Sequence, residues 1–392
     1  MKLLVLSFYF PPDLSAGSFR ISSIVSALAE LGIEIEVIST LPNRYASFTA
    51  EAPAVENFGS ITVRRVALPP HDSGMMDQAR AFSAYYREVK KHTSKIKYDA
   101  VFSTSSRLFT AFLGAQIARR KSIPLYLDIR DIFVDTLKDL LPPKLTWVTL
   151  PFLKLLERYT FQTAKRINLV SPGFENYFKA RYPQIDYRWF TNGIDDEFIN
   201  VPMLNDDEFK NAGRIRVLYA GNIGEGQGLH TIIPNLARRL SDVADFYIIG
   251  AGGKHQELES QCKYLQNVAL LPPVKRLDLI DAYVKADVLF LHLNDYEAFK
   301  KVLPSKIFEY AALGKPILAG VSGYAEYFLK ENVSNCQVFE PSNDEQAADG
   351  FHKLEFKTSE RSEFVENFAR QKIMKEMAND IMDFVRGNDN HV

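Results

Sequence analysis

Short apolar runs alternate with amphipathic stretches along most of this chain. The run Leu3–Phe8 is followed by a helical pattern over Ser18–Leu31, which Gly32 ends, and then by a second apolar run at Ile35–Ser39. The alternation continues with predicted strands and helices at Ala100–Ser103, Phe109–Arg119, Leu125–Asp128, Leu145–Lys165 and Arg166–Ser171. Strands separated by helices predict a parallel sheet covered on both faces.

A second alternation begins after a turn signal at Thr191–Asp195 and a polar stretch at Asn205–Gly213. Its predicted strands and helices are Arg216–Gly221, Leu229–Leu240, Ala244–Gly250, Lys254–Leu265, Val268–Leu271, Leu277–Lys285, Val288–Leu293 and Pro316–Ala319. We therefore expect an α/β protein with two Rossmann-like domains that face a cleft, at residues 1–200 and 201–370. A last helix near Phe364–Val385 is predicted, and residues 371–392 are a candidate to cross back to the first domain.

The composition agrees with two domains and argues against a nucleic-acid partner and a transmembrane helix. A chain of 392 residues with 46% hydrophobic content exceeds what one core usually holds. The 47 basic and 48 acidic residues nearly cancel, so no global field favours a nucleic-acid partner. The two cysteines, Cys262 and Cys336, are too few for a disulfide framework and favour a reducing cytosol. No run of about twenty apolar residues predicts a transmembrane helix.

The segment Pro304–Pro316 carries the clearest chemical signal. Its proline starts a helix, Gly314 ends the helix, and a buried strand follows. Lys306 and Glu309 are spaced i,i+3 and can share one face of this helix. A lysine suits a phosphate and a carboxylate suits a pair of sugar hydroxyls, so the segment predicts a nucleotide-sugar site.

Glycine-rich loops follow other predicted strands. Four glycines lie between Gly221 and Gly228, and Gly250–Gly253 forms a second such loop, where backbone amides can approach a diphosphate. After the first strand, Gly17 leads into a helix that carries Arg20 in its first turn, and this too suits an anion. An ordinary capped turn explains the same residues equally well.

These motifs together resemble the GT-B glycosyltransferases of the large retaining family 4. The resemblance rests on Phe10–Gly17, Asp128–Asp131, Asn192–Asp195, Tyr219–Asn222, Gly250–Gly252, Ala286–Val288 and above all Pro304–Pro316. Within the family the chain is most similar to bacterial surface-polysaccharide enzymes of the fucosamine-transferase type. The resemblance implies an acceptor-binding first domain and a nucleotide-sugar-binding second domain.

The resemblance also implies roles for particular residues. Glu309 matches the second of two family glutamates and would hold the ribose hydroxyls. The first falls at a lysine, so the chain departs from the pattern, and Glu297 is a candidate replacement. A lysine cannot accept a hydroxyl hydrogen bond but can lie near phosphate. The donor segment implied here is Lys301, Val302 and Leu303.

Charge compensation for the diphosphate is a second departure. The positions where the family often has an arginine and a lysine are the neutral Asn222 and Gln227. Lys306 is the first candidate to replace them and Arg20 the second, assisted by amides of the glycine loops. The candidate donor-binding set is therefore Gly17, Arg20, Gly221, Asn222, Gly224, Gln227, Gly250, Gly252, Lys301, Val302, Leu303 and Glu309. We expect no cofactor and no metal, because the seven histidines are scattered.

Many relatives carry a histidine near the reacting sugar, and here Arg130 takes its place. Asp131 is then a candidate to position or deprotonate the acceptor hydroxyl, or to hold the donor sugar. A structural ion pair of Arg130 and Asp131 is the alternative. With Lys306, these two residues form the candidate catalytic set.

Residues 137–167 combine six basic and two acidic residues with many apolar ones. This composition suits docking on an anionic membrane, and a helix packed into its own domain would explain it as well.

The sequence therefore predicts a retaining glycosyltransferase that moves a sugar from a nucleotide diphosphate sugar, with uridine as the commoner base, to a lipid-linked saccharide. We expect it in the bacterial cytoplasm, with a candidate peripheral contact on the inner membrane. Two alternatives remain at this point. A nucleotide-sugar epimerase of the same fold would convert the donor without an acceptor, and a non-catalytic scaffold would bind the donor without turnover.

Overall fold

The computed structural model describes residues 1–13, 15–42, 51–69, 75–105, 108–132, 134–135, 143–201 and 213–387. The chain divides into two compact units. Unit 1 consists of Met1–Asn192 and Arg370–Val392, and unit 2 consists of Gly193–Ala369. The division thus falls at Asn192 rather than at residue 200, and most of the polar stretch at Asn205–Gly213 lies outside the described residues.

Unit 1 is built on an eight-stranded sheet with the order β3-β4-β2-β1-β5-β6-β7-β8. The strands are β1 (Lys2–Leu6), β2 (Glu34–Thr40), β3 (Val55–Phe58), β4 (Ile61–Val66), β5 (Ala100–Thr104), β6 (Leu125–Ile129), β7 (Arg166–Leu169) and β8 (Asp186–Arg188). All neighbours are parallel except β3 and β4, which form an antiparallel hairpin that the sequence analysis did not predict. The expectation of a purely parallel sheet is therefore wrong at this edge.

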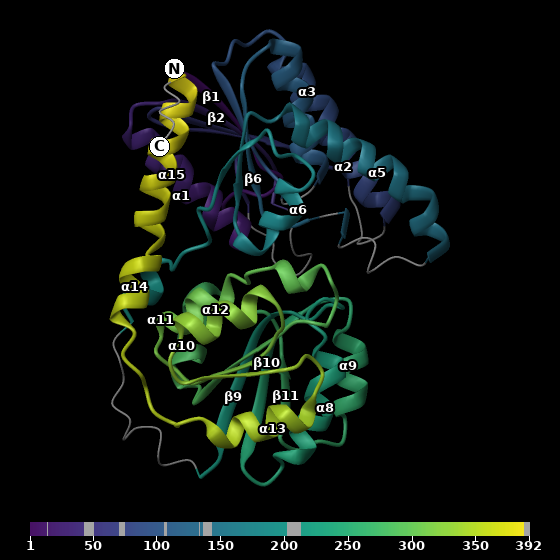
Figure 1. Cartoon of the computed structure of the whole chain (residues 1–392), viewed down its shortest axis with the longest axis vertical. Coiled ribbons are helices and arrows are strands. Elements are labelled where there is room, and N and C mark those ends of the chain that lie inside the picture. Colours follow the sequence, from purple (N-terminus) through teal and green to yellow (C-terminus); the bar gives the residue numbers. More distant parts are fainter. Residues whose placement is uncertain are drawn as a thin grey trace. The chain divides into compact units, whose positions relative to one another are not determined.

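Helices cover both faces of this sheet (Figure 1). Helices α1 (Ala16–Glu30) and α15 (Arg370–Arg386) pack side by side on one face. Helices α2 (Met75–Thr93), α3 (Leu108–Lys121) and α5 (Pro143–Thr163) cover the other, and the short η1 (Pro172–Phe174) and α6 (Glu175–Lys179) follow β7. No helix among the described residues combines the length and apolar character needed to span a bilayer.

The end of the chain returns to unit 1. We predicted one helix near Phe364–Val385, but the structure has two, α14 (Ser362–Phe368) in unit 2 and α15 in unit 1, separated at Ala369. The expectation of a single helix is wrong because Ala369 has an extended ψ of 123°. The apolar face of α15 is buried within unit 1 through Ile373, Met374, Met377, Ile381 and Phe384.

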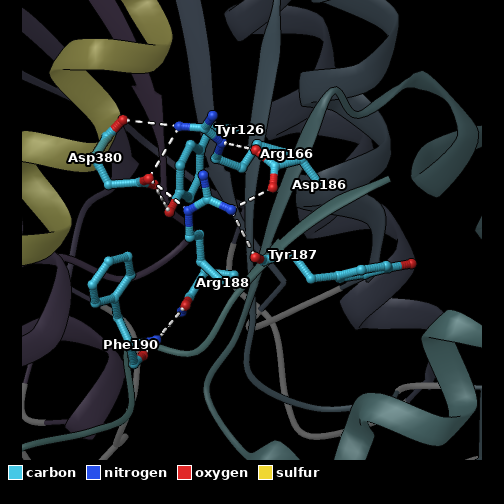
Figure 2. Close-up of polar contacts among 8 residues, drawn as sticks. Tyr126, Arg166, Asp186, Tyr187, Arg188, Phe190 and Asp380 are labelled. Carbon is cyan, nitrogen blue, oxygen red and sulfur yellow. Dashed lines mark hydrogen bonds and ion pairs between the residues drawn. The ribbon is translucent and has the colours of Figure 1, made fainter. Parts of the chain in front are cut away.

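A polar network fastens α15 to the sheet of unit 1 (Figure 2). Asp380 of α15 accepts hydrogen bonds from Tyr126 Oη at 2.9 Å, Arg166 Nη1 at 3.1 Å and Arg188 Nε at 2.7 Å. These three partners lie on β6, β7 and β8. Both arginines also pair with Asp186, so the two cations share two carboxylates. The network fixes one turn of α15 over three adjacent strands.

Unit 2 is built on a six-stranded sheet with the order β11-β10-β9-β12-β13-β14. Its strands are β9 (Ile215–Asn222), β10 (Ala244–Ala251), β11 (Val268–Leu271), β12 (Val288–His292), β13 (Ile317–Gly320) and β14 (Cys336–Phe339), and all pairs are parallel. Because β9 and β12 are adjacent and parallel, the loops that follow them lie side by side at one edge of the sheet.

Helices lie on both faces of this sheet (Figure 1), and each face buries one hydrophobic core. One core contains residues of α8 (Leu229–Arg239), α9 (His255–Cys262) and α13 (Asp344–Lys353). The other contains residues of α7 (Asp196–Ile199), α10 (Arg276–Lys285), α11 (Lys306–Ala312), α12 (Tyr324–Asn332) and α14. The predicted strands and helices of this half are present, and the elements β14, α12 and α13 were not predicted.

His292 ends β12 and is completely buried between aromatic rings. Its Nδ1 lies 2.7 Å from the Gln227 carbonyl oxygen, and its Nε2 accepts the Ser342 N–H at 2.9 Å. A carbonyl needs a donor and an N–H needs an acceptor, so these contacts fix the neutral Nδ1–H tautomer. Burial lowers the pKa of His292 to about 4. The imidazole therefore connects the loop after β9 with the loop after β14.

Replacing Asp380 by alanine should loosen α15. The change leaves Arg166, which is 5% exposed, without one of its two carboxylates, and breaking a largely buried pair costs about 3 kcal/mol. We expect hydrogen exchange of α15 amides to accelerate roughly a hundredfold. Asp383→Ala, at an exposed position of the same helix, is the matched control. Unchanged protection of α15 in Asp380→Ala would show that the network does not hold the helix.

His292 should make unit 2 sensitive to acid. Because its pKa is lower in the folded chain than in the unfolded chain, its contribution to stability is complete above pH 6.5 and is lost as the pH falls toward 4. The difference in unfolding free energy between wild type and His292→Gln should shrink by about 3 kcal/mol between pH 7.5 and 4. Urea denaturation at several pH values measures this, with the exposed His352→Gln as control. A difference that stays constant with pH would refute the assignment.

Candidate functional site

In unit 1 the loops after β1 and β6 meet at the carboxyl end of the sheet. Gly17 lies against Arg130, because a Cβ atom added at Gly17 would fall 2.1 Å from Arg130 Nη1. The Arg130 main-chain N–H donates to Ser105 Oγ at 2.9 Å. Burial lowers the pKa of the Arg130 guanidinium, although Asp131 opposes this shift. The Asp131 residue itself is exposed, so the structure places a half-buried cation beside an accessible carboxylate.

Arg20 occupies a different environment from the one we expected. Its side chain is 2% exposed and forms a two-point ion pair with Asp128, with both nitrogen–oxygen distances 2.9 Å. The same guanidinium donates to the carbonyl oxygens of Thr191 and Phe190 at 2.6 and 2.8 Å. This geometry gives Arg20 a structural role, because its side chain connects α1 with β6 and with Phe190 and Thr191 near the end of the Met1–Asn192 segment of unit 1. It favours Lys306 over Arg20 as the phosphate-binding candidate.

In unit 2 the two glycine loops touch each other. A Cβ atom at Gly250 would lie 1.8 Å from the Gly221 carbonyl oxygen, and one at Gly252 would lie 2.4 Å from the Ile223 oxygen. Their φ angles of 156° and 158° also belong to the region that favours glycine. Near the ends of β9 and β10, at Gly221 and Gly250, the two strands therefore approach each other through main chain alone.

Lys306 extends over the main chain of Gly221. A Cβ atom at Gly221 would lie 2.7 Å from Lys306 Nζ. The ammonium lies 6.0 Å from the centre of the Tyr219 ring and forms no hydrogen bond or ion pair with another residue that the structure describes. Burial lowers the pKa of Lys306, and Glu309 partly offsets this effect. A half-buried cation without a carboxylate partner is a suitable site for an anion.

Glu309 lies one helical turn further along α11 and has a side-chain exposure of 13%. The Tyr283 hydroxyl is 3.4 Å from its Oε2, and Arg276 Nη1 is 3.8 Å from its Oε1. The structure thus places Lys306 over the Gly221 loop, with Glu309 one turn away on the same helix. Sequence reasoning missed Arg276 and Tyr283, since both belong to an ordinary amphipathic pattern.

The loop after β9 is held in one conformation by contacts with the loop after β12. Asn222 Nδ2 donates to Gln227 Oε1 at 2.7 Å, and the Asn294 main-chain N–H donates to the Gly226 carbonyl at 2.9 Å. The Tyr296 hydroxyl donates to Glu225 Oε1 at 2.7 Å. Gly224 packs on Asn222, since a Cβ atom there would lie 2.5 Å from Asn222 Nδ2. The two neutral residues at the positions where the resemblance implies cations thus bind each other.

The segment before α11 is mixed in character. Lys301 ends the short η3 helix (Phe299–Lys301), Val302 is half-buried, and the Leu303 side chain belongs to the hydrophobic core. Glu297, the candidate for the missing carboxylate, pairs with Lys300 at 2.7 Å. Among the described residues, no cluster of histidine, cysteine and acidic side chains could hold a metal ion.

Two family models match the chain, one in each half. Residues 17–192 match a glycosyl transferase 4-like domain, and residues 203–371 match glycosyl transferases group 1. A curated relative is WcaI of Escherichia coli (strain K12), named as a glycosyl transferase of colanic acid biosynthesis, with 33% identity over 112 residues. That alignment spans 28% of this chain and 27% of the relative.

Solved structures resemble the whole chain at low sequence identity. Sucrose-phosphate synthase from Thermosynechococcus elongatus has a TM-score of 0.79, 13% identity, and coverage of 98% of this chain and 99% of the other. HepE of Anabaena, in complex with UDP and glucose, has a TM-score of 0.66, 16% identity, and coverage of 98% and 100%. WaaG, a glycosyltransferase involved in lipopolysaccharide biosynthesis, has a TM-score of 0.64, 16% identity, and 98% coverage of both chains.

The fold expected from the sequence is confirmed, since the structural neighbours are GT-B glycosyltransferases. The fucosamine-transferase likeness stays a prediction. The chain combines a glycosyl transferase 4-like domain with a glycosyl transferases group 1 domain in a GT-B fold.

Proposed function

We propose that this protein is a retaining glycosyltransferase that moves a sugar from a UDP-linked donor to a hydroxyl of a lipid-linked saccharide. The observation that carries the proposal is the position of Lys306, whose ammonium lies over the Gly221 main chain and next to Glu309. A phosphate needs a cation and free amides, and a ribose needs a hydrogen-bond acceptor. This edge of unit 2 offers all three.

In this proposal the chemical work of unit 2 is to stabilise the departing diphosphate. Lys306 and the amides of the glycine loops neutralise the charge that develops on it, without a metal ion. Glu309 accepts hydrogen bonds from the ribose hydroxyls. A half-buried ammonium is well suited to this role, because electrostatic attraction is stronger where water is excluded. Retention of the anomeric configuration follows from the family resemblance.

Unit 1 would receive the acceptor. Asp131 is exposed and next to the half-buried Arg130, so it can position or deprotonate a hydroxyl while the arginine limits its mobility. Relatives of this chain support a saccharide acceptor, since WcaI is named for colanic acid biosynthesis and WaaG for lipopolysaccharide biosynthesis. UDP bound to HepE supports uridine as the donor base.

A lipid-linked acceptor requires contact with a membrane, and α5 supplies a suitable surface. Phe152 and Leu155 are 59% and 64% exposed, next to the exposed Lys154 and Arg158. Lys138, the one basic residue of 137–142, lies outside the described part of the chain. We place peripheral contact with the inner face of the bacterial inner membrane at this helix, which is part of the 137–167 segment.

A basic cavity next to α5 supports the same contact. It has a volume of about 420 Å³ and is lined by Lys90, Arg119, Arg120, Lys121 and Tyr159, among others, with no acidic side chain. None of these four cations pairs with a carboxylate of another described residue. Tyr159 follows Phe152 and Leu155 at helical spacing, so the apolar stripe leads to the cavity. Anionic lipid headgroups would bind the cations of the cavity, while Phe152 and Leu155 enter the apolar layer of the membrane.

Donor binding is tested with a thermal-shift screen against UDP, GDP, ADP and their common sugars, with and without magnesium. We expect UDP compounds to raise the melting temperature equally in EDTA and in magnesium, because Lys306 supplies the compensating charge. Lys306→Ala and Glu309→Ala should each abolish most of this shift and cut sugar transfer at least about tenfold. Both residues are half-buried but belong to neither hydrophobic core of unit 2, so the variants should fold.

Lys330→Ala is a matched control, since the exposed Lys330 pairs with the half-buried Glu326 on α12. A product epimerised without acceptor would favour the epimerase, and binding without turnover on lipid extracts would favour the scaffold. Near-normal transfer by both site variants, or no shift with any nucleotide, would overturn the proposed function.

Membrane contact is tested by co-sedimentation with vesicles of phosphatidylcholine, with and without phosphatidylglycerol. We expect binding only to the anionic vesicles, and less of it in high salt. Phe152→Ser with Leu155→Ser should weaken binding roughly tenfold, because two exposed side chains no longer enter the interface. Tyr264→Ser, at an 83% exposed site in unit 2, is the control. Equal binding by both variants would exclude α5 as the contact.

A further inference from the structure

We propose that Arg276 is a positioning residue for the donor site: it holds the Glu309 carboxylate in the orientation that accepts the ribose hydroxyls. This inference rests on the proposed function. Arg276 begins α10 and lies outside every motif that pointed to the site. Its role is to act through Glu309 and not to touch the donor.

The guanidinium of Arg276 faces three carboxylates from two helices and a turn. Nη2 lies 2.6 Å from Asp195 Oδ2, Nε lies 2.7 Å from Glu197 Oε2, and Nη1 lies 3.8 Å from Glu309 Oε1. The side chain is 16% exposed, and its guanidinium carbon is 4.6 Å from the centre of the Phe198 ring. Two short contacts and an aromatic surface therefore fix the plane of the fork.

The contact with Glu309 differs from the other two in a way that suits a binding site. At 3.8 Å it is an ion pair but too long for a hydrogen bond. The cation thus attracts and orients the carboxylate, while its oxygens keep lone pairs for a ligand. Asp195 and Glu197, in contrast, use theirs on Arg276 at hydrogen-bonding distance.

Little else in the surroundings orients Glu309. Among the described residues, its remaining polar contact is with the Tyr283 hydroxyl at 3.4 Å, from a tyrosine whose ring is completely buried against Tyr310. If Arg276 were removed, the three carboxylates of Asp195, Glu197 and Glu309 would repel one another. The Glu309 side chain could then turn toward Lys306, one helical turn away. Such a movement would weaken the ribose contact and cancel the charge that the diphosphate needs.

This arrangement gives a physical role to the turn at Asn192–Asp195. Its aspartate fixes the arginine that fixes the glutamate, although Asp195 and Glu309 are far apart in the sequence. Arg276 is linked to Asp195 by a hydrogen bond and to Glu309 by an ion pair, and all three residues belong to unit 2. A substitution at Asp195 should therefore change the affinity for the donor through Arg276, although neither residue touches the ligand.

The test is a double-mutant cycle on UDP binding, measured by calorimetry, with the KM for the UDP-sugar as a second readout. Arg276→Gln, Arg276→Lys and Glu309→Gln are made alone, and Arg276→Gln is combined with Glu309→Gln. We expect each Arg276 variant to weaken UDP binding about tenfold and to raise KM more than it lowers kcat. In the Glu309→Gln background, Arg276→Gln should have almost no further effect.

Arg214→Gln is the matched control, because Arg214 also pairs with a carboxylate in unit 2, Asp245, but precedes β9 at the opposite end of the strand. If Arg276→Gln does not fold, Arg276→Lys decides, since lysine keeps the charge and lacks the three-way fork. Additive effects, or Arg276 variants with wild-type affinity, would overturn the inference while leaving the proposed function intact. Unchanged UDP binding by Glu309→Gln would instead remove Glu309 from the donor site.

Discussion

The close approach of main chain to main chain at the ends of β9 and β10 is the constraint on which the candidate site depends. The Gly250 position has no room for a side chain, since a Cβ atom would lie 1.8 Å from the Gly221 oxygen. Gly221 in turn leaves the space over which Lys306 extends. Parallel strands bring these loops to one edge, and the glycines turn that edge into a surface of amides with a cation above it. A side chain at either glycine would displace the lysine or separate the strands.

The sequence was sufficient for the parts of the fold that follow from a single local pattern. The strands β1, β2, β5, β6 and β7 of unit 1, the strands β9 to β13 of unit 2 and the helix Lys306–Ala312 were predicted because apolar runs, a starting proline and a terminal glycine are local signals. Asp287 directly precedes β12, and its Oδ2 accepts the Arg216 N–H at 2.7 Å. The strand Val55–Phe58 was missed because three of its four residues are exposed and it pairs only at a sheet edge. The break at Ala369 was missed because the apolar pattern continues across it.

The site was predictable only where chemistry and spacing coincide in a short segment. Lys306 and Glu309 met that condition, whereas Arg20 shows how it fails. An arginine in the first turn of a helix after the first strand fits an anion site by pattern, yet its partners Asp128, Phe190 and Thr191 are remote in sequence. Burial of an arginine depends on such remote acceptors, because an unpaired buried cation is costly. The position of Arg276 beside Glu309 could not be predicted for the same reason, because its carboxylate partners are also remote in sequence.

The distribution of paired charges at this edge of unit 2 identifies which cation a diphosphate can use. Lys254 lies between Glu225 and Glu257, Lys300 pairs with Glu297, and Arg276 with Asp195, so each already has a carboxylate partner. An anionic ligand would have to displace those carboxylates, at the cost of leaving them unpaired. Lys306 has no such partner among the described residues, and its half-burial makes an unneutralised charge unfavourable. In the proposed function, binding a diphosphate would relieve that cost, so one lysine would replace the two cations that Asn222 and Gln227 do not provide.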